Sequence, residues 1–165
     1  MLKYIYTFFI GILLVTFIGV GIAAFYEGPK PPEYSANDMY VAKPDMNDAS
    51  SAAWLEADRA RTIKQDAEYK EFQAKNRLYS RNVSVITTIA AVIILVISLT
   101  MLKKLDLLSD GLLMGGLFTE IYSIIRGFES QDNKFRFVVV TIGLIISLLV
   151  GYLKFIKPQP KNPKF

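Results

Sequence analysis

The sequence predicts an all-α fold, an integral membrane four-helix bundle whose long second helix protrudes from the bilayer. Two observations predict this fold: long apolar segments recur along the chain, and the charged residues gather between them. The chain is 52% hydrophobic and only 21% charged. A charge at the centre of a lipid-exposed helix costs roughly 2.5–3.5 kcal/mol, so a bilayer confines charges to the segments between spans.

The first predicted span lies in residues 1–26 and runs without a charge from Ile5 to Phe25. About 20 helical residues cross a hydrocarbon core of about 30 Å. A cleavable secretory signal is the alternative, because Lys3 precedes the apolar run and small residues occur near its end. The run is longer than the hydrophobic region of a typical signal, so we expect an uncleaved anchor.

Residues 27–81 form a polar extramembrane segment. It begins with a proline-rich stretch around Pro29–Pro32, which we expect to be extended. From about Asp48 or Ser50 the composition favours helix, and neither Gly nor Pro occurs through Leu102. The sequence therefore predicts one helix that leaves solvent and continues into the second span.

The polar part of this helix is only weakly amphipathic and shows no sustained coiled-coil seam. Two interpretations remain open for residues 48–75. They form a solvated helix that packs on its own proline-rich strand, or they form a docking surface for a protein partner.

Residues 82–157 hold three further spans, and residues 158–165 form a tail rich in proline and lysine. The second span covers about Val83–Leu102, and a tight turn at Lys103, Lys104 and Asp106 leads to the third. The third span covers about Leu107–Phe128, and the fourth covers about Phe137–Ile156.

Four spans place both termini on one side of the membrane. That side carries seven Lys or Arg residues, and the other carries twelve, nine of them in residues 27–81. The raw count thus favours the opposite orientation, but ten acidic residues balance the long segment. We expect cytoplasmic termini in the cell membrane and an extracytoplasmic segment at 27–81. The net charge of +4 comes mostly from the tail, which favours contact with the lipid bilayer and not with nucleic acid.

The chain contains no Cys and no His, which removes thiolate nucleophiles, the commonest general base near neutral pH and the commonest transition-metal ligand. The segment Asp45–Asp48 lacks the glycine and distal glutamate of a calcium loop. Gly115 and Gly116 follow no strand and lack nucleotide-motif spacing. We therefore expect no enzymatic activity, no cofactor and no metal site.

Small residues recur every four positions along the third span, and a shorter series follows in the fourth. In lipid, small residues let helix backbones approach closely. The pattern predicts close helix packing, either within one chain or between copies in a homo-oligomer. The packing positions are Gly111, Gly115, Thr119, Ser123 and Gly127, followed by Gly143, Ser147 and Gly151.

Glu120 lies near the middle of the third span, where an ionisable group usually faces a bundle interior or cavity. It is predicted to be a proton or cation site, one carboxylate of an oligomeric ring, or a structural glutamate that ties helices together. Arg126 lies closer to the interface, where its stem can snorkel, and Asp110 is expected to be an interfacial or capping carboxylate. The candidate polar track comprises Thr119, Glu120, Tyr122, Ser123 and Arg126.

The segment Phe25–Tyr34, with the sequence FYEGPKPPEY, resembles the region after the first span in small uncharacterised bacterial membrane proteins. Those proteins also combine a charged helix with a glycine-rich third span near an arginine, as Gly115, Gly116 and Arg126 stand here. The resemblance implies the same four-span architecture, and it implies no activity.

Two classes of function follow from these patterns. The first is an accessory, scaffold or envelope interaction protein, because catalytic residue types are missing while a polar helix is exposed. The second is a homo-oligomeric ion channel or simple transporter that uses the polar track of the third span.

Overall fold

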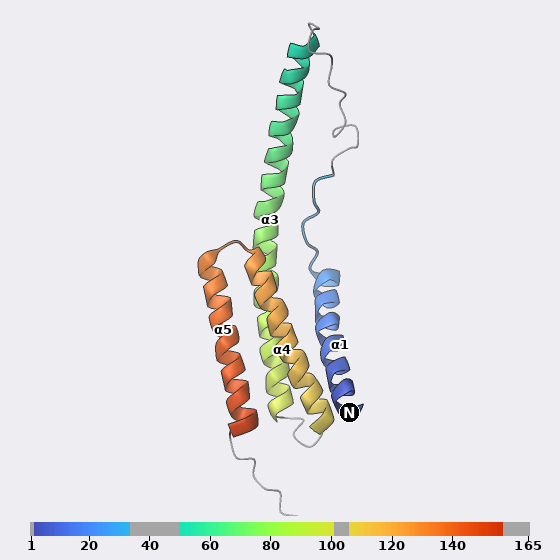
Figure 1. Ribbon diagram of the computed structural model, residues 1–165, viewed down its shortest axis with the longest axis vertical. Coiled ribbons are helices and arrows are strands. Elements are labelled where there is room, and N and C mark those ends of the chain that lie inside the picture. Colours follow the sequence, from blue (N-terminus) through green and yellow to red (C-terminus); the bar gives the residue numbers. More distant parts are fainter. Residues whose placement is uncertain (1, 34–49, 101–105, 157–165) are drawn as a thin grey trace, which may run out of the picture. The chain divides into compact units, whose positions relative to one another are not determined.

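The computed structural model describes residues 2–33, 50–100 and 106–156, and over these ranges it contains helices and no strand (Figure 1). The helices are α1 (Leu2–Phe25), α3 (Ser50–Thr100), α4 (Asp106–Glu129) and α5 (Asn133–Gly151), and a π-helix, Tyr152–Ile156, follows α5. Each of the four α-helices is long and apolar enough to cross a membrane. The predicted all-α, multi-pass membrane fold is therefore confirmed. The predicted cap at Asp48, the turn at Lys103 and Lys104, and the tail 158–165 lie outside the described residues.

The chain divides into two compact units: residues 28–77, and residues 1–27 together with 78–165. The helix α3 contributes its first part to the former and its last part to the latter, as the absence of Gly and Pro predicts.

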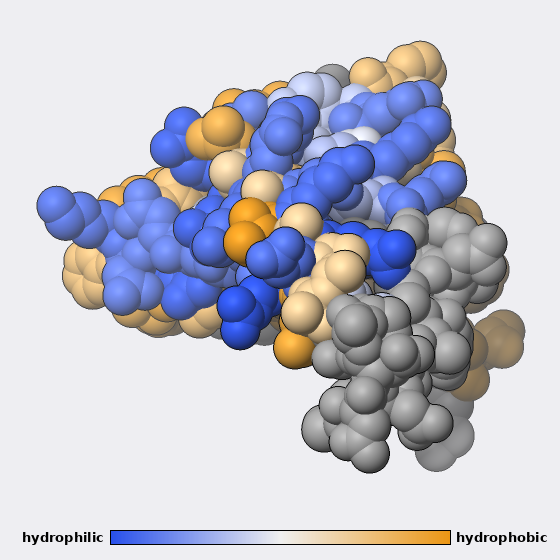
Figure 2. Space-filling view, turned by 90° about the horizontal axis from the view of Figure 1, so that it is seen from above, coloured by the Kyte–Doolittle hydropathy of each residue, from blue (hydrophilic) through white to orange (hydrophobic). Residues whose placement is uncertain are grey.

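The unit 28–77 contains the charged part of α3. Glu71 and Lys75 form an ion pair of 2.7 Å at the i,i+4 spacing, and Tyr69 contacts Phe72 with ring centroids 6.4 Å apart. Exposed helical pairs of this kind contribute little to stability, because water screens both charges. Seen from above in Figure 2, hydrophilic residues cover most of the visible surface that is not grey.

The bundle unit is organised around α4, which lies between α1 and α5 in Figure 1. The side chains of Ile10 and Leu14 meet Gly111 and Gly115, so α1 and α4 run parallel. Bonds from Ser98 to Ser109 and from Ser84 to Ser123 show that α3 runs antiparallel to α4. Each helix of the bundle thus has a face against α4.

The turn between α4 and α5 is short and well capped. The carboxylate of Asp132 accepts hydrogen bonds from the backbone N–H groups of Lys134 and Phe135, which satisfies the first turn of α5. Gln131 has a φ of 56°, in the left-handed region that reverses the chain. The antiparallel pairing of α4 with α5 follows from this tight connection.

The far end of α5 carries an ion pair. Lys154, in the π-helical turn, donates to Asp110 at 2.7 Å. Asp110 is the fifth residue of α4, so it serves as an ion-pair partner and not as a helix cap. The pair joins the start of α4 to the end of the fourth span.

Candidate functional site

The face of α4 toward α1 is built from glycine. A Cβ added at Gly115 would lie 2.6 Å from Leu14 Cδ2, and one added at Gly111 would lie 2.9 Å from Ile10 Cγ2. On the opposite side of the contact, a Cβ at Gly11 would lie 3.3 Å from the backbone nitrogen of Gly115. These glycines let aliphatic side chains of α1 rest directly on the backbone of α4.

The face of α4 toward α3 is built from hydroxyl groups. Ser84 donates to the carbonyl of Ser123 at 2.8 Å, and Ser123 donates back to the carbonyl of Ser84 at 2.7 Å. Ser98 and Ser109 repeat this reciprocal arrangement near the other end, at 2.7 and 3.0 Å. Each pair closes two hydrogen bonds between helices, and all four serines are buried.

Between the two serine pairs, the α3–α4 contact continues with Ala91 and Gly116. A Cβ at Gly116 would lie 3.5 Å from the carbonyl oxygen of Ala91 and 2.7 Å from two side-chain carbons of Leu95. A small residue therefore occurs every seventh position on each helix: Ser84, Ala91 and Ser98 on α3 face Ser123, Gly116 and Ser109 on α4. Antiparallel helices that cross at a small angle repeat their contacts at this interval.

The predicted four-residue stripe on α4 does not face one neighbour. Each four-residue step turns the helix by about 40° beyond a full turn, so the series drifts across its surface. Gly111 and Gly115 meet α1, whereas Ser123 bonds to α3 and Gly127 lies between Ser84 and Val139 of α5. Small residues also recur every seven positions in both α3 and α4, a repeat that was not predicted although the sequence contains it.

The shorter series on α5 contributes one packing position. A Cβ at Gly143 would lie 3.0 Å from Ile124 Cδ1 and 3.2 Å from Glu120 Oε1. Ser147 is exposed, and no atom of the described residues lies within 4 Å of a Cβ added at Gly151. Gly143 alone of the three lies against α4.

Glu120 is buried in the middle of the bundle, with 3% of its surface exposed. Both carboxylate oxygens are buried, and no side chain or backbone N–H of the described residues donates to them. Gly143 provides the space that the carboxylate occupies on the side of α5. The predicted burial of this group is observed, and no helix-tying hydrogen bond from it is present among these residues.

Thr119 and Ser123 are fully buried like Glu120, and their hydroxyl groups are already engaged. Thr119 donates to the carbonyl of Gly115 at 2.7 Å, and the Ser123 hydroxyl lies 2.6 Å from that of Thr88. Together with the reciprocal bond to Ser84, these contacts leave the carboxylate without a donor from its hydroxyl neighbours.

Tyr122 and Arg126 lie in a different environment, near the C-terminal end of α4. The guanidinium of Arg126 donates to the Tyr122 hydroxyl at 3.0 Å and to Glu129 at 2.8 Å. It also lies 5.9 Å from the ring centroid of Tyr79, which stacks on Tyr26 at 5.2 Å. The structure thus divides the predicted polar track into a buried part around Glu120 and a half-buried arginine–tyrosine cluster.

The arginine–tyrosine cluster ties three helices together at one end of the bundle. Glu129 accepts a hydrogen bond from Ser80 of α3 as well as from Arg126, and Asn82 donates to the Tyr26 hydroxyl. Arg126 was predicted from the sequence as a site residue, whereas Tyr26, Ser80 and Glu129 were not. Their polar character just outside the apolar runs was the available signal.

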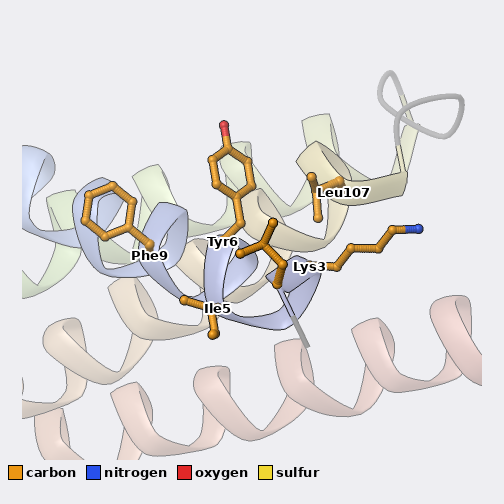
Figure 3. A pocket seen from close by; sticks show the side chains of 6 residues that line it. Lys3, Ile5, Tyr6, Phe9 and Leu107 are labelled. Atoms are coloured by element: carbon orange, nitrogen blue, oxygen red, sulfur yellow. The ribbon is translucent and has the colours of Figure 1, made fainter.

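A separate hollow of about 550 Å³ lies along the first turns of α1 (Figure 3). Its lining is apolar apart from Lys3 and Tyr6, and the side chain of Lys3 points away from the other labelled residues. The helix here is exposed in the isolated chain and apolar enough for lipid contact. The hollow shares no residue with the buried polar site.

Among the described residues, no group of three or more Asp, Glu, His or Cys side chains could hold a metal ion. No protein-family profile, curated protein or solved structure matches the chain. Any functional conclusion therefore depends on the residues themselves.

Proposed function

We propose that the chain is a multi-pass accessory or scaffold protein of the cell envelope that presents the charged part of α3 to a protein partner. The observation that supports this most directly is the exposure of apolar side chains on that part of the helix. Leu55, Ile63 and Tyr69 expose 48%, 70% and 49% of their surface. Protein interfaces combine such an apolar centre with a polar, charged rim.

The three apolar residues span about a third of the helix circumference. Spacings of eight and fourteen residues place Ile63 about 80° from Leu55 in one direction and Tyr69 about 40° from it in the other. Acidic and basic side chains surround them, so a partner with an apolar groove and mixed charge suits this side. The membrane spans would hold the helix at the bilayer, where a partner meets it repeatedly.

A photo-crosslinking amino acid at Ile63 or Tyr69 tests the docking proposal in native membranes. We expect a discrete protein adduct from each position and none from Ile145, an exposed apolar residue of α5. Deletion of residues 48–75 should release the same partner while the remaining spans stay in the membrane. Retention of the partner by the deletion variant would contradict the proposal.

We also propose that the termini are cytoplasmic and residues 27–81 extracytoplasmic, because ten acidic residues balance the nine Lys and Arg residues of that segment. Because the chain has no Cys, a single introduced cysteine reports its own position. We expect Ala74→Cys to react with a membrane-impermeant maleimide in intact cells, and Lys3→Cys to react only after permeabilisation. The reverse pattern would invert the orientation.

A channel or simple transporter is the second candidate, and the buried carboxylate of Glu120 favours it. Intramembrane ionisable groups commonly mark ion or proton pathways. In proteoliposomes, ion flux that is lost in Glu120→Gln would support this function, and absence of flux under varied gradients would count against it.

A further inference from the structure

Glu120 carries the only buried side-chain oxygens of the bundle unit that lack a hydrogen-bond partner within the described ranges. Polar groups buried in protein are normally hydrogen-bonded, because water is no longer present to solvate them. The hydroxyl groups nearest in sequence, those of Thr119 and Ser123, are bonded elsewhere. The cost of burying the carboxylate without hydrogen bonds must therefore be offset in another way.

Within the described residues, no charged group faces the carboxylate to neutralise it. On α4, Arg126 is paired with Glu129, and Asp110 is paired with Lys154. On α3 no charged residue occurs between Asn82 and Thr100, and on α5 none occurs between Phe137 and Leu153. On α1 the charged residue is Lys3, in the first turn. An unpaired buried ion costs several kcal/mol even after the protein relaxes.

We propose that Glu120 is a proton-binding site inside the bilayer, held at the α4–α5 contact in the space that Gly143 leaves open. Binding one proton removes the charge and leaves a neutral acid with a single O–H to place. A metal ion would need several ligands, and the described residues supply no group of three or more of the usual acidic, His or Cys ligands. The inference does not depend on the docking role proposed for α3.

Gly143 defines the room available to the neutral acid. A Cβ there would approach Oε1 to 3.2 Å and Ile124 Cδ1 to 3.0 Å. Gly143→Ala should therefore displace the carboxyl group, while Gly151→Ala, which meets no described atom, is the matched control.

A membrane-permeant carbodiimide tests this proposal on the full chain in liposomes. Its N=C=N group adds the carboxyl oxygen to carbon while the carboxyl proton moves to nitrogen, so reaction requires the protonated acid. Mapping by mass spectrometry should show labelling at Glu120 at neutral pH and loss of that label in Glu120→Gln. A water-soluble carbodiimide should leave Glu120 unlabelled because the site is buried.

Three comparisons make the result decisive. Glu68→Gln, on the exposed charged part of α3, should retain the label on Glu120. Gly143→Ala should slow labelling, and Gly151→Ala should not. Protection of Glu120 by sodium would overturn the proton assignment in favour of a cation site. Absence of labelling on the folded wild type would also overturn it.

Infrared spectroscopy provides a measurement that does not depend on a reagent. The wild type should show the carbonyl stretch of a protonated carboxyl group, and Glu120→Gln should lose that band. If the wild type instead shows only ionised carboxylates, the proposal is wrong. A folded Glu120→Asp variant, which retains the acid, should keep a band that Glu120→Gln lacks.

Discussion

The two faces of α4 that pack against α1 and α3 achieve close helix packing in different ways. Toward α1, glycine removes the side chain, and aliphatic groups of Ile10 and Leu14 rest on the backbone. Toward α3, serine keeps a short side chain and uses it to bond the opposite backbone in both directions. In lipid, helices gain little from hydrophobic exclusion, so either dense contact or hydrogen bonding must hold them together.

The difference predicts how each face responds to change. Substituting a glycine on the α1 side by a larger residue should destabilise the bundle strongly, because neighbouring side chains already occupy the space that the new side chain would need. Removing a serine hydroxyl on the α3 side should destabilise it less, because each hydroxyl contributes one modest hydrogen bond. Glu120 points toward a third side of α4, against α5, where no hydroxyl group of the described residues bonds its carboxylate oxygens.

The largest effect is expected from Gly115→Leu. Since a Cβ at this position would already lie 2.6 Å from Leu14, the added side chain must push α1 away from α4. Overpacking of this kind typically costs about 1–3 kcal/mol. The measurement is reversible unfolding in mixed micelles. Gly19→Leu, at a position with no described atom within 4 Å, should change stability little. Equal losses in the two variants would contradict the assigned α1 contact.

A smaller effect is expected from Ser84→Ala combined with Ser123→Ala. Interhelical hydrogen bonds in membranes average about 0.6 kcal/mol and reach about 1–2 kcal/mol. Each substitution removes one of the two reciprocal hydrogen bonds, since the accepting carbonyl belongs to the backbone and remains in place. The 3.2 Å contact between the two hydroxyl oxygens is the side-chain interaction that a double-mutant cycle should measure as coupling.

The matched control for the serine cycle is Thr16→Ala combined with Ser123→Ala. Thr16 donates only to Ile12 of its own helix among the described contacts, so it should show no coupling to Ser123. If Ser84→Ala and Ser123→Ala each lose no more stability than Thr16→Ala, the hydroxyl face contributes packing alone.

The smallest effect is expected from Lys154→Gln. The ion pair with Asp110 is partly exposed, with 29% and 47% of the two side chains accessible. Pairs at such positions contribute about 0.2–1 kcal/mol and weaken with salt. We expect a slight, salt-sensitive loss of unfolding free energy in Lys154→Gln. A loss as large as that of Gly115→Leu would mean that the π-helical turn depends on this contact.

Much of the fold was predictable because a bilayer imposes simple rules on length and charge. The continuous helix α3 followed from the absence of Gly and Pro, and the burial of Glu120 followed from its depth in the span.

The partition of the polar track was not predictable in the same way. Which neighbour each face of α4 meets depends on helix crossing and register, so Thr119 and Arg126 could not be separated by sequence spacing alone. The reciprocal serine pairs required the antiparallel register of α3 and α4 to be known. Their seven-residue interval, read on both helices at once, would have indicated it.

Cysteine cross-linking tests most directly whether the small residues of α3 and α4 meet within one chain. The natural absence of Cys makes Ser84→Cys with Ser123→Cys, and Ser98→Cys with Ser109→Cys, unambiguous pairs. In the wild type the Oγ atoms of the two serine pairs lie 3.2 and 3.4 Å apart. Mild oxidation should therefore form a disulfide within the monomer for both cysteine pairs. The shifted pair Ser84→Cys with Ser109→Cys should not cross-link. Covalent dimers from the matched pairs, or cross-linking of the shifted pair, would contradict the account.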